Sequence, residues 1–253
     1  MIETKISYSW DRDVHRVGTL HTPRRLGPAA LVFLGPPGAG KGTHAQHIAN
    51  EYSLPRISTG DVFRSHVARK TALGLQSAEI MSRGLLVPDD VVCEMLREHI
   101  CSLGCSSCLV LDGFPRSVYQ ANWLDCFLRT RSGNNHELLH NAPLAIQISV
   151  EHDEVMRRLS GRRSCPSCGR SYNLDSQPPV NSGICDYDET KLVMRPDDSE
   201  SVIRERLMVH DENALALAES YRSRGRLLQI DGNTTVDAVR NAIGIQLESH
   251  FIF

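Results

Sequence analysis

No apolar stretch in the sequence approaches the roughly 18 to 20 residues that a membrane-spanning helix requires. The longest apolar runs have only the length of β-strands. The sequence also lacks an excess of either charge, because 28 Lys and Arg residues accompany 30 Asp and Glu residues. We therefore expect a soluble protein with no nucleic-acid or membrane partner, in which any basic site is local.

The first 28 residues lack the apolar segment of a signal peptide. Acidic residues such as Glu3, Asp11 and Asp13 lie among their basic residues, whereas transit peptides are poor in acids. We expect residues 1–28 to form a disordered extension, and a misassigned start codon is the alternative. The chain has eight cysteines but is too large to depend on disulfides for its stability, which favours a reducing, cytoplasmic location.

Short apolar runs separated by helical patterns indicate an α/β fold. Ala29–Leu34 is continuously apolar and leads into Gly35-Pro-Pro-Gly, as expected of a strand buried on both faces before a helix from about Lys41. Four more runs are strand-like: Leu54–Ser58, Cys108–Asp112, Ala145–Val150 and Leu227–Asp231. The alternation predicts a parallel sheet wrapped by helices, with ligands at the carboxyl ends of the strands.

Two segments interrupt this alternation. Residues 130–143 are expected to form a surface loop without chemistry. Residues 164–194 are rich in Cys, Pro, Gly, Ser and Asp and have no helical period, which predicts a small inserted domain. We therefore divide the chain into the extension, a core over 29–163, an insertion over 164–196, and the rest of the core over 197–253.

A glycine-rich loop follows the first strand and opens a helix. Its glycines allow backbone N–H groups to surround phosphate oxygens, and Lys41 adds a charge for the terminal phosphates of a ligand. Gly42 stands where such loops commonly carry Ser or Thr, so phosphates and waters should hold Mg²⁺, and Asp112 could position those waters. A glycine-rich turn without a ligand is the alternative. The predicted ATP-binding loop residues are Gly38, Ala39, Gly40, Lys41, Gly42 and Thr43.

Six motifs occur in order along the chain: Gly35–Thr43, Ile57–Arg64, Gly84–Asp89, Leu111–Arg116, Gly161–Arg163 and Arg195–Asp198. Together they resemble the adenylate kinase family in its long form with an inserted lid, over about residues 29–248. The resemblance implies a three-layer P-loop nucleoside monophosphate kinase fold with a parallel sheet and a small lid. It also implies that the protein is an enzyme, a phosphotransferase acting on ATP, AMP and ADP, and a monomer.

The resemblance also implies roles for particular residues. The helices that bind AMP would lie at about 58–87. Residues near the base or ribose of ATP would be Ser171, Tyr172 and Thr234. The AMP site would comprise Thr59, Arg64, Leu85, Leu86, Val87, Gly113, Phe114, Pro115, Arg116, Gln120, Arg195 and Arg206.

Two positions favour AMP over other monophosphates. Thr59 and Gln120 resemble the choices of adenine-binding relatives, because a glutamine amide can both donate to and accept from the adenine edge. Related pyrimidine monophosphate kinases tend to carry Ala and Asn there. A UMP or CMP kinase is one alternative, and a catalytically silent nucleotide-binding protein is another.

Phosphoryl transfer between two nucleotides requires positive charge to converge on their phosphates. Arginines suit this because they remain ionised and bind phosphate oxygens in pairs. AMP is already largely ionised at neutral pH, so no general base is expected, and a closing lid would exclude water. The resemblance implies which residues supply this charge, because they match its motif positions: the predicted catalytic residues are Lys41, Arg116, Arg158, Arg162, Arg195 and Arg206. Four other arginines are expected to be solvated: Arg97, Arg129, Arg222 and Arg240.

The insertion contains two short pairs of potential metal ligands. Cys165 and Cys168 precede Cys185 and Asp188, a spacing that suits a structural zinc site with four protein ligands. A lid held by hydrogen bonds alone is the alternative. A second cysteine group, Cys101, Cys105 and Cys108, has iron–sulfur spacing, but we expect a helix-to-strand turn there.

Overall fold

A computed structural model of the chain describes residues 28–103, 108–131 and 142–250. The predicted extension lies outside the described residues except for residue 28, and most of the predicted 130–143 loop lies outside them too. Two residues at the start of that segment, Thr130 and Arg131, prolong a helix.

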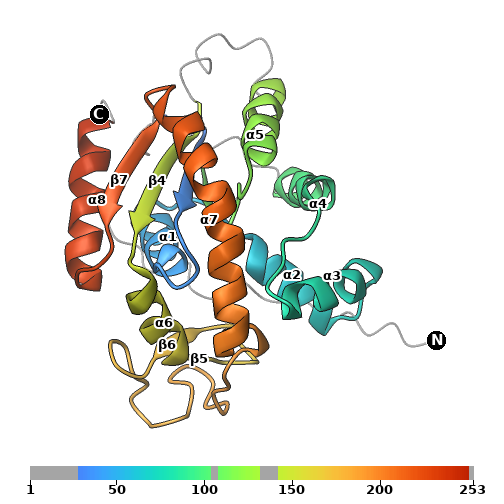
Figure 1. Ribbon diagram of the computed structural model, residues 1–253, viewed down its shortest axis with the longest axis vertical. Helices are drawn as coiled ribbons and strands as arrows, with labels where there is room; N and C mark the ends of the chain where they lie inside the picture. Colours follow the sequence, from blue (N-terminus) through green and yellow to red (C-terminus); the bar gives the residue numbers. More distant parts are fainter. Residues whose placement is uncertain (1–27, 104–107, 132–141, 251–253) are drawn as a thin grey trace.

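Five parallel strands form the central sheet (Figure 1), as the alternation of patterns predicted. Their order is β2-β3-β1-β4-β7. The strands are β1 (Ala30–Leu34), β2 (Arg56–Ser58), β3 (Leu109–Asp112), β4 (Leu144–Ser149) and β7 (Leu227–Asp231). β2 begins two residues later than predicted. The Leu54 N–H donates to Ala49 O of the preceding helix at 2.8 Å, so Leu54 belongs to the end of that helix and does not join the strand.

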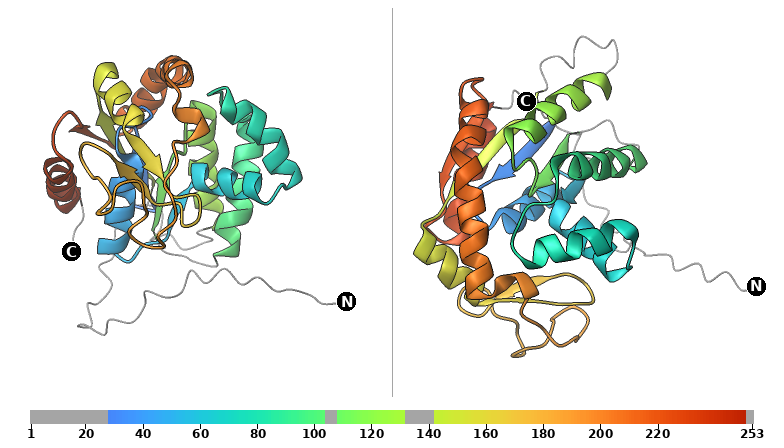
Figure 2. Two further views of the ribbon diagram at one scale, coloured as in Figure 1. Left: turned by 90° about the horizontal axis from the view of Figure 1, so that it is seen from below. Right: turned by 45° about the vertical axis from the view of Figure 1, so that its right-hand side comes forward.

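Helices lie on both faces of the sheet (Figure 2), and long helix α7 runs past its carboxyl edge toward the insertion. They are α1 (Lys41–Glu51), α2 (Thr59–Ala68), α3 (Ala72–Ser82), α4 (Asp89–Ser102), α5 (Val118–Arg131), α6 (His152–Ser160), α7 (Glu200–Arg222) and α8 (Val236–His250). Among the described residues, none of these helices combines the length and apolar character needed to cross a bilayer.

β1 is the middle strand of the sheet, and every residue in it is buried. Its side chains alternate between two apolar clusters, because successive residues of a strand point to opposite faces. Leu31 and Phe33 join the cluster that contains Ile48 of α1, while Val32 joins the one that contains Leu96 of α4. The strand that leads into the phosphate loop is therefore fixed from both sides.

The insertion departs from α6 and returns at α7. Its antiparallel strands β5 (Arg162–Ser164) and β6 (Ser171–Asn173) form a separate two-stranded sheet. Only three buried residues form its apolar cluster, namely Cys165, Cys185 and Leu192. A core this small leaves a need for another stabilising element.

Candidate active site

The phosphate loop joins β1 to the first turn of α1. Gly38 and Gly40 have φ angles of 78° and 86°, which favour glycine, and a Cβ at Gly35 would collide with the Ile148 carbonyl. The Lys41 ammonium donates to Gly35 O at 2.7 Å and Pro36 O at 2.6 Å, so the lysine lies along its own loop. The loop and its helix are where the sequence predicted them.

Lys41 lies within a cluster of cations. Burial lowers the pKa of Lys41 to about 7, against the opposing influence of Asp112. The neighbouring cations Arg116, Arg206 and Arg162 contribute to this lowering. An anion placed among these groups would favour the charged form of the lysine.

Thr59 and Arg116 meet at the carboxyl end of β3. The Thr59 hydroxyl, at the start of α2, donates to Gly113 O at 3.0 Å, and Arg116 Nε donates to the same oxygen at 2.8 Å. Desolvation and the neighbouring Arg206 lower the pKa of Arg116 to about 10. β3 therefore brings two of the predicted AMP-site residues together.

The side chain of Gln120 is bound within the protein. It is 2% exposed, its amide donates to Asp89 Oδ1 at 2.6 Å, and its carbonyl accepts the Arg116 N–H at 2.7 Å. Both ends of the amide thus have protein partners. Recognition of a base by Gln120 would use the remaining N–H and lone pair of that amide.

Two acidic residues hold arginines from the insertion and from α7. Asp198 binds the Arg162 guanidinium through both oxygens, with Nε at 2.7 Å from Oδ2. Arg206 lies 3.0 Å from Asp197 Oδ2 and 3.3 Å from Asp198 Oδ1. The acids lie in a short 3₁₀ helix, Pro196–Asp198, that ends before α7 begins. This helix ties the insertion to the core.

Arg195 is held by the insertion. It donates to Ser164 Oγ and Ser171 Oγ, both at 2.7 Å. Desolvation, together with Arg64 and Arg162, lowers the pKa of Arg195 to about 10. Ser171, which was predicted to lie near ATP, orients this arginine here.

Arg158 on α6 is held by two hydrogen bonds. Its Nε donates to Glu154 Oε1 at 2.6 Å and its terminal nitrogen to Gly232 O at 2.7 Å. Hydrogen bonds from Arg157, and then from Arg158, lower the pKa of Glu154 to about 2. Glu154 is therefore ionised at neutral pH.

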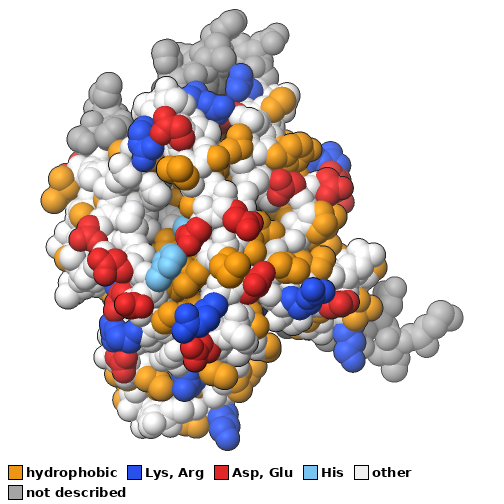
Figure 3. Space-filling model, in the orientation of Figure 1, with side chains coloured by type: hydrophobic (Ala, Val, Ile, Leu, Met, Phe, Trp, Pro, Cys, Tyr) orange, Lys and Arg blue, Asp and Glu red, His pale blue; other side chains and the backbone are white. Residues whose placement is uncertain are grey.

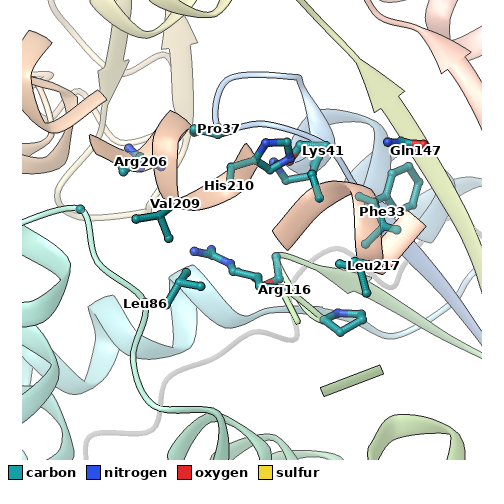
Figure 4. Close-up of a pocket in the computed structure, with 16 residues that line it drawn as sticks. Phe33, Pro37, Lys41, Leu86, Arg116, Gln147, Arg206, Val209, His210 and Leu217 are labelled. Carbon is teal, nitrogen blue, oxygen red and sulfur yellow. Dashed lines mark hydrogen bonds between the residues drawn. The ribbon is translucent and has the colours of Figure 1, made fainter. Parts of the chain in front are cut away.

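A cavity between the phosphate loop and α7 collects many of these groups (Figure 4), including Lys41, Arg116 and Arg206. Its predicted lining residues also include Leu86, Gly113 and Pro115. The predicted residues outside this lining include Arg64, Arg158, Arg162, Arg195, Thr59, Gln120, Ser171, Tyr172 and Thr234. The cavity brings together the loop lysine and arginines from two separate elements.

Sequence reasoning missed part of this cavity wall. His210 lines the cavity beside Val209, one helical turn after Arg206 on α7. That i, i+4 spacing from a predicted phosphate arginine was the available signal.

On the face in Figure 3, basic and acidic side chains are interspersed, so the cationic groups of the site are a local feature.

The predicted metal ligands converge in the insertion. Donor atoms of Cys165, Cys168, Cys185 and Asp188 all lie within 4.8 Å of one another, and the Cys168 and Cys185 sulfurs are 3.6 Å apart. Zn–S bonds of about 2.3 Å in a tetrahedron place sulfurs about 3.8 Å apart, so the set fits zinc. The Tyr172 hydroxyl lies 3.4 Å from Cys185 Sγ, next to this cluster.

The second cysteine group is described in part. Cys101 is exposed near the end of α4, and Cys108 is buried immediately before β3. Cys105 lies outside the described residues, so the prediction of a turn without a cluster stays a prediction.

A phosphate loop after the central strand of a parallel sheet, facing arginines from separate elements and an inserted lid, defines a P-loop nucleoside monophosphate kinase. The family model described as "Adenylate kinase" matches residues 33–226. The chain is 40% identical over 216 residues to the adenylate kinase of Clostridium perfringens (strain 13 / Type A), covering 85% of this chain and 96% of that protein. It is 41% identical over 218 residues to that of Clostridium acetobutylicum, covering 85% and 98%.

The chain therefore belongs to the adenylate kinase family. The resemblance to this family that the six motifs indicated is confirmed, and so is the predicted α/β fold class with a parallel sheet.

Proposed function

We propose that the protein catalyses reversible transfer of the terminal phosphoryl group of Mg·ATP to AMP, giving two ADP. The supporting observation is the convergence of Lys41, Arg116 and Arg206 on one cavity between the phosphate loop and α7. This class of reaction needs that convergence, because charge spreads over the oxygens of the transferring group. The activity maintains the balance among the adenine nucleotides.

The residues would act by position and charge. Residues 38–43 would surround the ATP phosphates, and Arg116 would bind the AMP phosphate close to them. The AMP oxygen that attacks is largely ionised at neutral pH, so no side chain needs to remove a proton. The histidines have no catalytic role in this proposal.

The site fits Mg²⁺ held through water. A Cβ at Gly42 would lie 3.0 Å from Asp112 Oδ2, so the absent side chain leaves that carboxylate close to the loop. Asp112 would accept hydrogen bonds from water molecules of the ion. When bound, Mg²⁺ neutralises charge on the phosphate oxygens.

The insertion would act as a lid. Arg162 and Arg206 now bind Asp198, and nucleotide phosphates offer the same kind of anionic oxygen, so the arginines could exchange one partner for the other. Arg158 and Arg195 would complete the positive charge from α6 and the lid. Closure would exclude water, the competing acceptor.

Zinc would have a structural role in the lid. Three thiolates and one carboxylate fill all four positions of a tetrahedral site and leave none for a substrate. The ion would supply the stability that the three-residue apolar cluster of the lid lacks.

We also propose that the acceptor is AMP and that the protein acts as a cytoplasmic monomer. The AMP preference rests on Thr59 and Gln120, with Ser171, Tyr172 and Thr234 assigned to the ATP side. The cysteines of the described residues form no disulfide, which suits a reducing compartment. Light scattering of the purified protein measures its mass in solution and would contradict the monomer if it gave a multiple of 28.2 kDa.

The test is an assay of ADP formation from Mg·ATP, with AMP, UMP, CMP and GMP offered separately. Strong turnover with AMP alone is the expected result. Turnover with UMP or CMP would support the pyrimidine kinase alternative. Nucleotide binding without turnover would support the silent alternative.

A further inference from the structure

Arg56, the first residue of β2, lies beside the carboxylate assigned to magnesium. Its terminal nitrogen is 2.8 Å from Asp112 Oδ2 and 3.6 Å from Asp61 Oδ2. The motifs assigned Arg56 no role, because it precedes the recognised Ile57–Arg64 motif by one residue. Parallel pairing of β2 with β3 brings the two side chains together, with Ser58 opposite Asp112.

The pair is partly shielded from water. The Arg56 side chain is 20% exposed and that of Asp112 is 13% exposed, so solvent screens their attraction less than that of a surface pair. Arg56 also donates to Gln46 Oε1 at 3.3 Å. Its buried Nε has no hydrogen-bond partner among the described residues, so the terminal nitrogens make the polar contacts of this guanidinium.

The guanidinium also lies next to the phosphate loop. A Cβ at Gly42 would be 3.4 Å from the terminal nitrogen of Arg56 and 3.0 Å from Asp112 Oδ2. P-loops commonly direct a Ser or Thr hydroxyl to Mg²⁺ from this position. In this chain the position is Gly42, and the Arg56 guanidinium and the Asp112 carboxylate lie beside the space that such a side chain would fill.

We propose that Arg56 is the counter-ion of Asp112 when nucleotide is bound without metal, and that it competes with hydrated Mg²⁺ for this carboxylate. The inference rests on the proposed role of Asp112. The guanidinium neutralises charge on Asp112 and occupies Oδ2, so the hydrated ion would meet a less negative carboxylate while this pair is formed. Arg56 thus reduces the benefit of Mg²⁺ to nucleotide binding, and it is a positioning residue.

The test measures a magnesium coupling, defined as the Kd of ATP in EDTA divided by its Kd in excess Mg²⁺, by calorimetry. By linkage, this ratio equals the factor by which the protein strengthens Mg²⁺ binding to ATP. Arg56→Gln should raise the ratio about threefold to fivefold, as loss of a partly exposed ion pair implies. The rise should come from weaker binding in EDTA, because an unpaired Asp112 repels the phosphates.

A structural defect would weaken ATP binding in both conditions and leave the ratio unchanged. Arg97→Gln is the matched control, because Arg97 forms an exposed pair with Glu94 on α4. Its ratio should equal that of the wild type. In an Asp112→Asn background, Arg56→Gln should no longer change the ratio.

An unchanged or lower ratio in Arg56→Gln overturns the inference, and so does an equal effect in the Asp112→Asn background. These results would leave the proposed function intact, because ADP formation by the wild type is assayed separately. A ratio near one in both the wild type and Arg56→Gln overturns both the inference and the magnesium role of Asp112.

Discussion

The buried carboxylate of Asp198 binds the guanidinium of Arg162 through both of its oxygens. The Asp198 side chain has no exposed surface, and Arg206 approaches the same carboxylate at 3.3 Å. One buried anion thus holds two cations, one from the lid and one from α7. Removal of the anion would leave Arg162 without this partner and Arg206 with Asp197 as its remaining carboxylate.

Asp198→Ala should therefore lower the free energy of unfolding by about 3 kcal/mol, as loss of one partner from a buried ion pair does. Urea denaturation measures this change. Asp175→Ala is the control, since Asp175 pairs with Arg157 at 3.1 Å on the surface, and it should cost less than about 1 kcal/mol. Equal losses in the two variants would contradict the special role of Asp198.

Arg116→Ala should lower kcat/KM for AMP by about 100- to 1,000-fold, the usual effect of removing one charge-stabilising donor. Steady-state assays with saturating Mg·ATP measure it. The midpoint of thermal unfolding should stay close to that of the wild type. Arg97→Ala should leave kcat/KM unchanged, and an unimpaired Arg116→Ala enzyme would remove that residue from the mechanism.

ATP binding at pH 8 should take up a proton. With a pKa of about 7, Lys41 is about nine-tenths neutral at this pH, and bound phosphates favour its charged form. Calorimetry in buffers of different ionisation enthalpy measures this uptake. It should disappear in Lys41→Met, and it should fall at pH 6, where the lysine is already charged. Equal uptake in wild type and Lys41→Met would rule out Lys41 as the source.

The same pKa shift has a defined effect on stability. Between pH 7 and the unfolded value of 10.5, the unfolded chain binds a proton at Lys41 that the folded chain does not. The contribution of Lys41 to the free energy of unfolding should therefore rise with pH across this window and level off outside it. Urea denaturation at pH 7 and pH 9 should show a smaller rise for Lys41→Met than for the wild type.

The protein purified without chelator should contain one zinc ion per chain, as measured by atomic emission. Cys185→Ser should lower the zinc content and make residues 165–194 more sensitive to protease, because the lid has little apolar core. Cys126→Ser should retain the metal, since Cys126 is exposed on α5. A wild-type protein without zinc and with a stable lid would favour the hydrogen-bonded alternative.

Local signals explain the parts of the fold that the sequence predicted well. β1 was found within one residue of its bounds because it is a short apolar run that ends at glycine, and β7 matched because its Leu and Ile residues are followed by Asp231 and a glycine. The order of strands in the sheet was not predictable in this way, because it depends on pairing between distant segments. The short length of β2 depends on Leu54 bonding back to α1.

In the site too, local motifs were predictable and contacts between distant segments were not. Lys41 and the arginines were predicted because they lie within recognisable motifs, but their partners depend on tertiary structure. The sequence does not show that Asp198 would be buried between two arginines, or that Gln120 would bind Asp89. Arg56 was missed for the same reason, since only the pairing of β2 with β3 brings it to Asp112.

The central position of β1 also constrains the order in which the protein can be assembled on the ribosome. Ala30 of β1 pairs with Leu109 of β3, and Leu31 pairs with Leu144 of β4, so both neighbours are synthesised long after β1. Until β4 emerges, one edge of this wholly apolar strand has no partner, a condition that exposes nascent chains to aggregation. Translation that stops before residue 144 would yield a chain in which β1, the strand that leads into the glycine loop, lies at an open edge of the sheet, which makes such fragments natural substrates for chaperones and proteases.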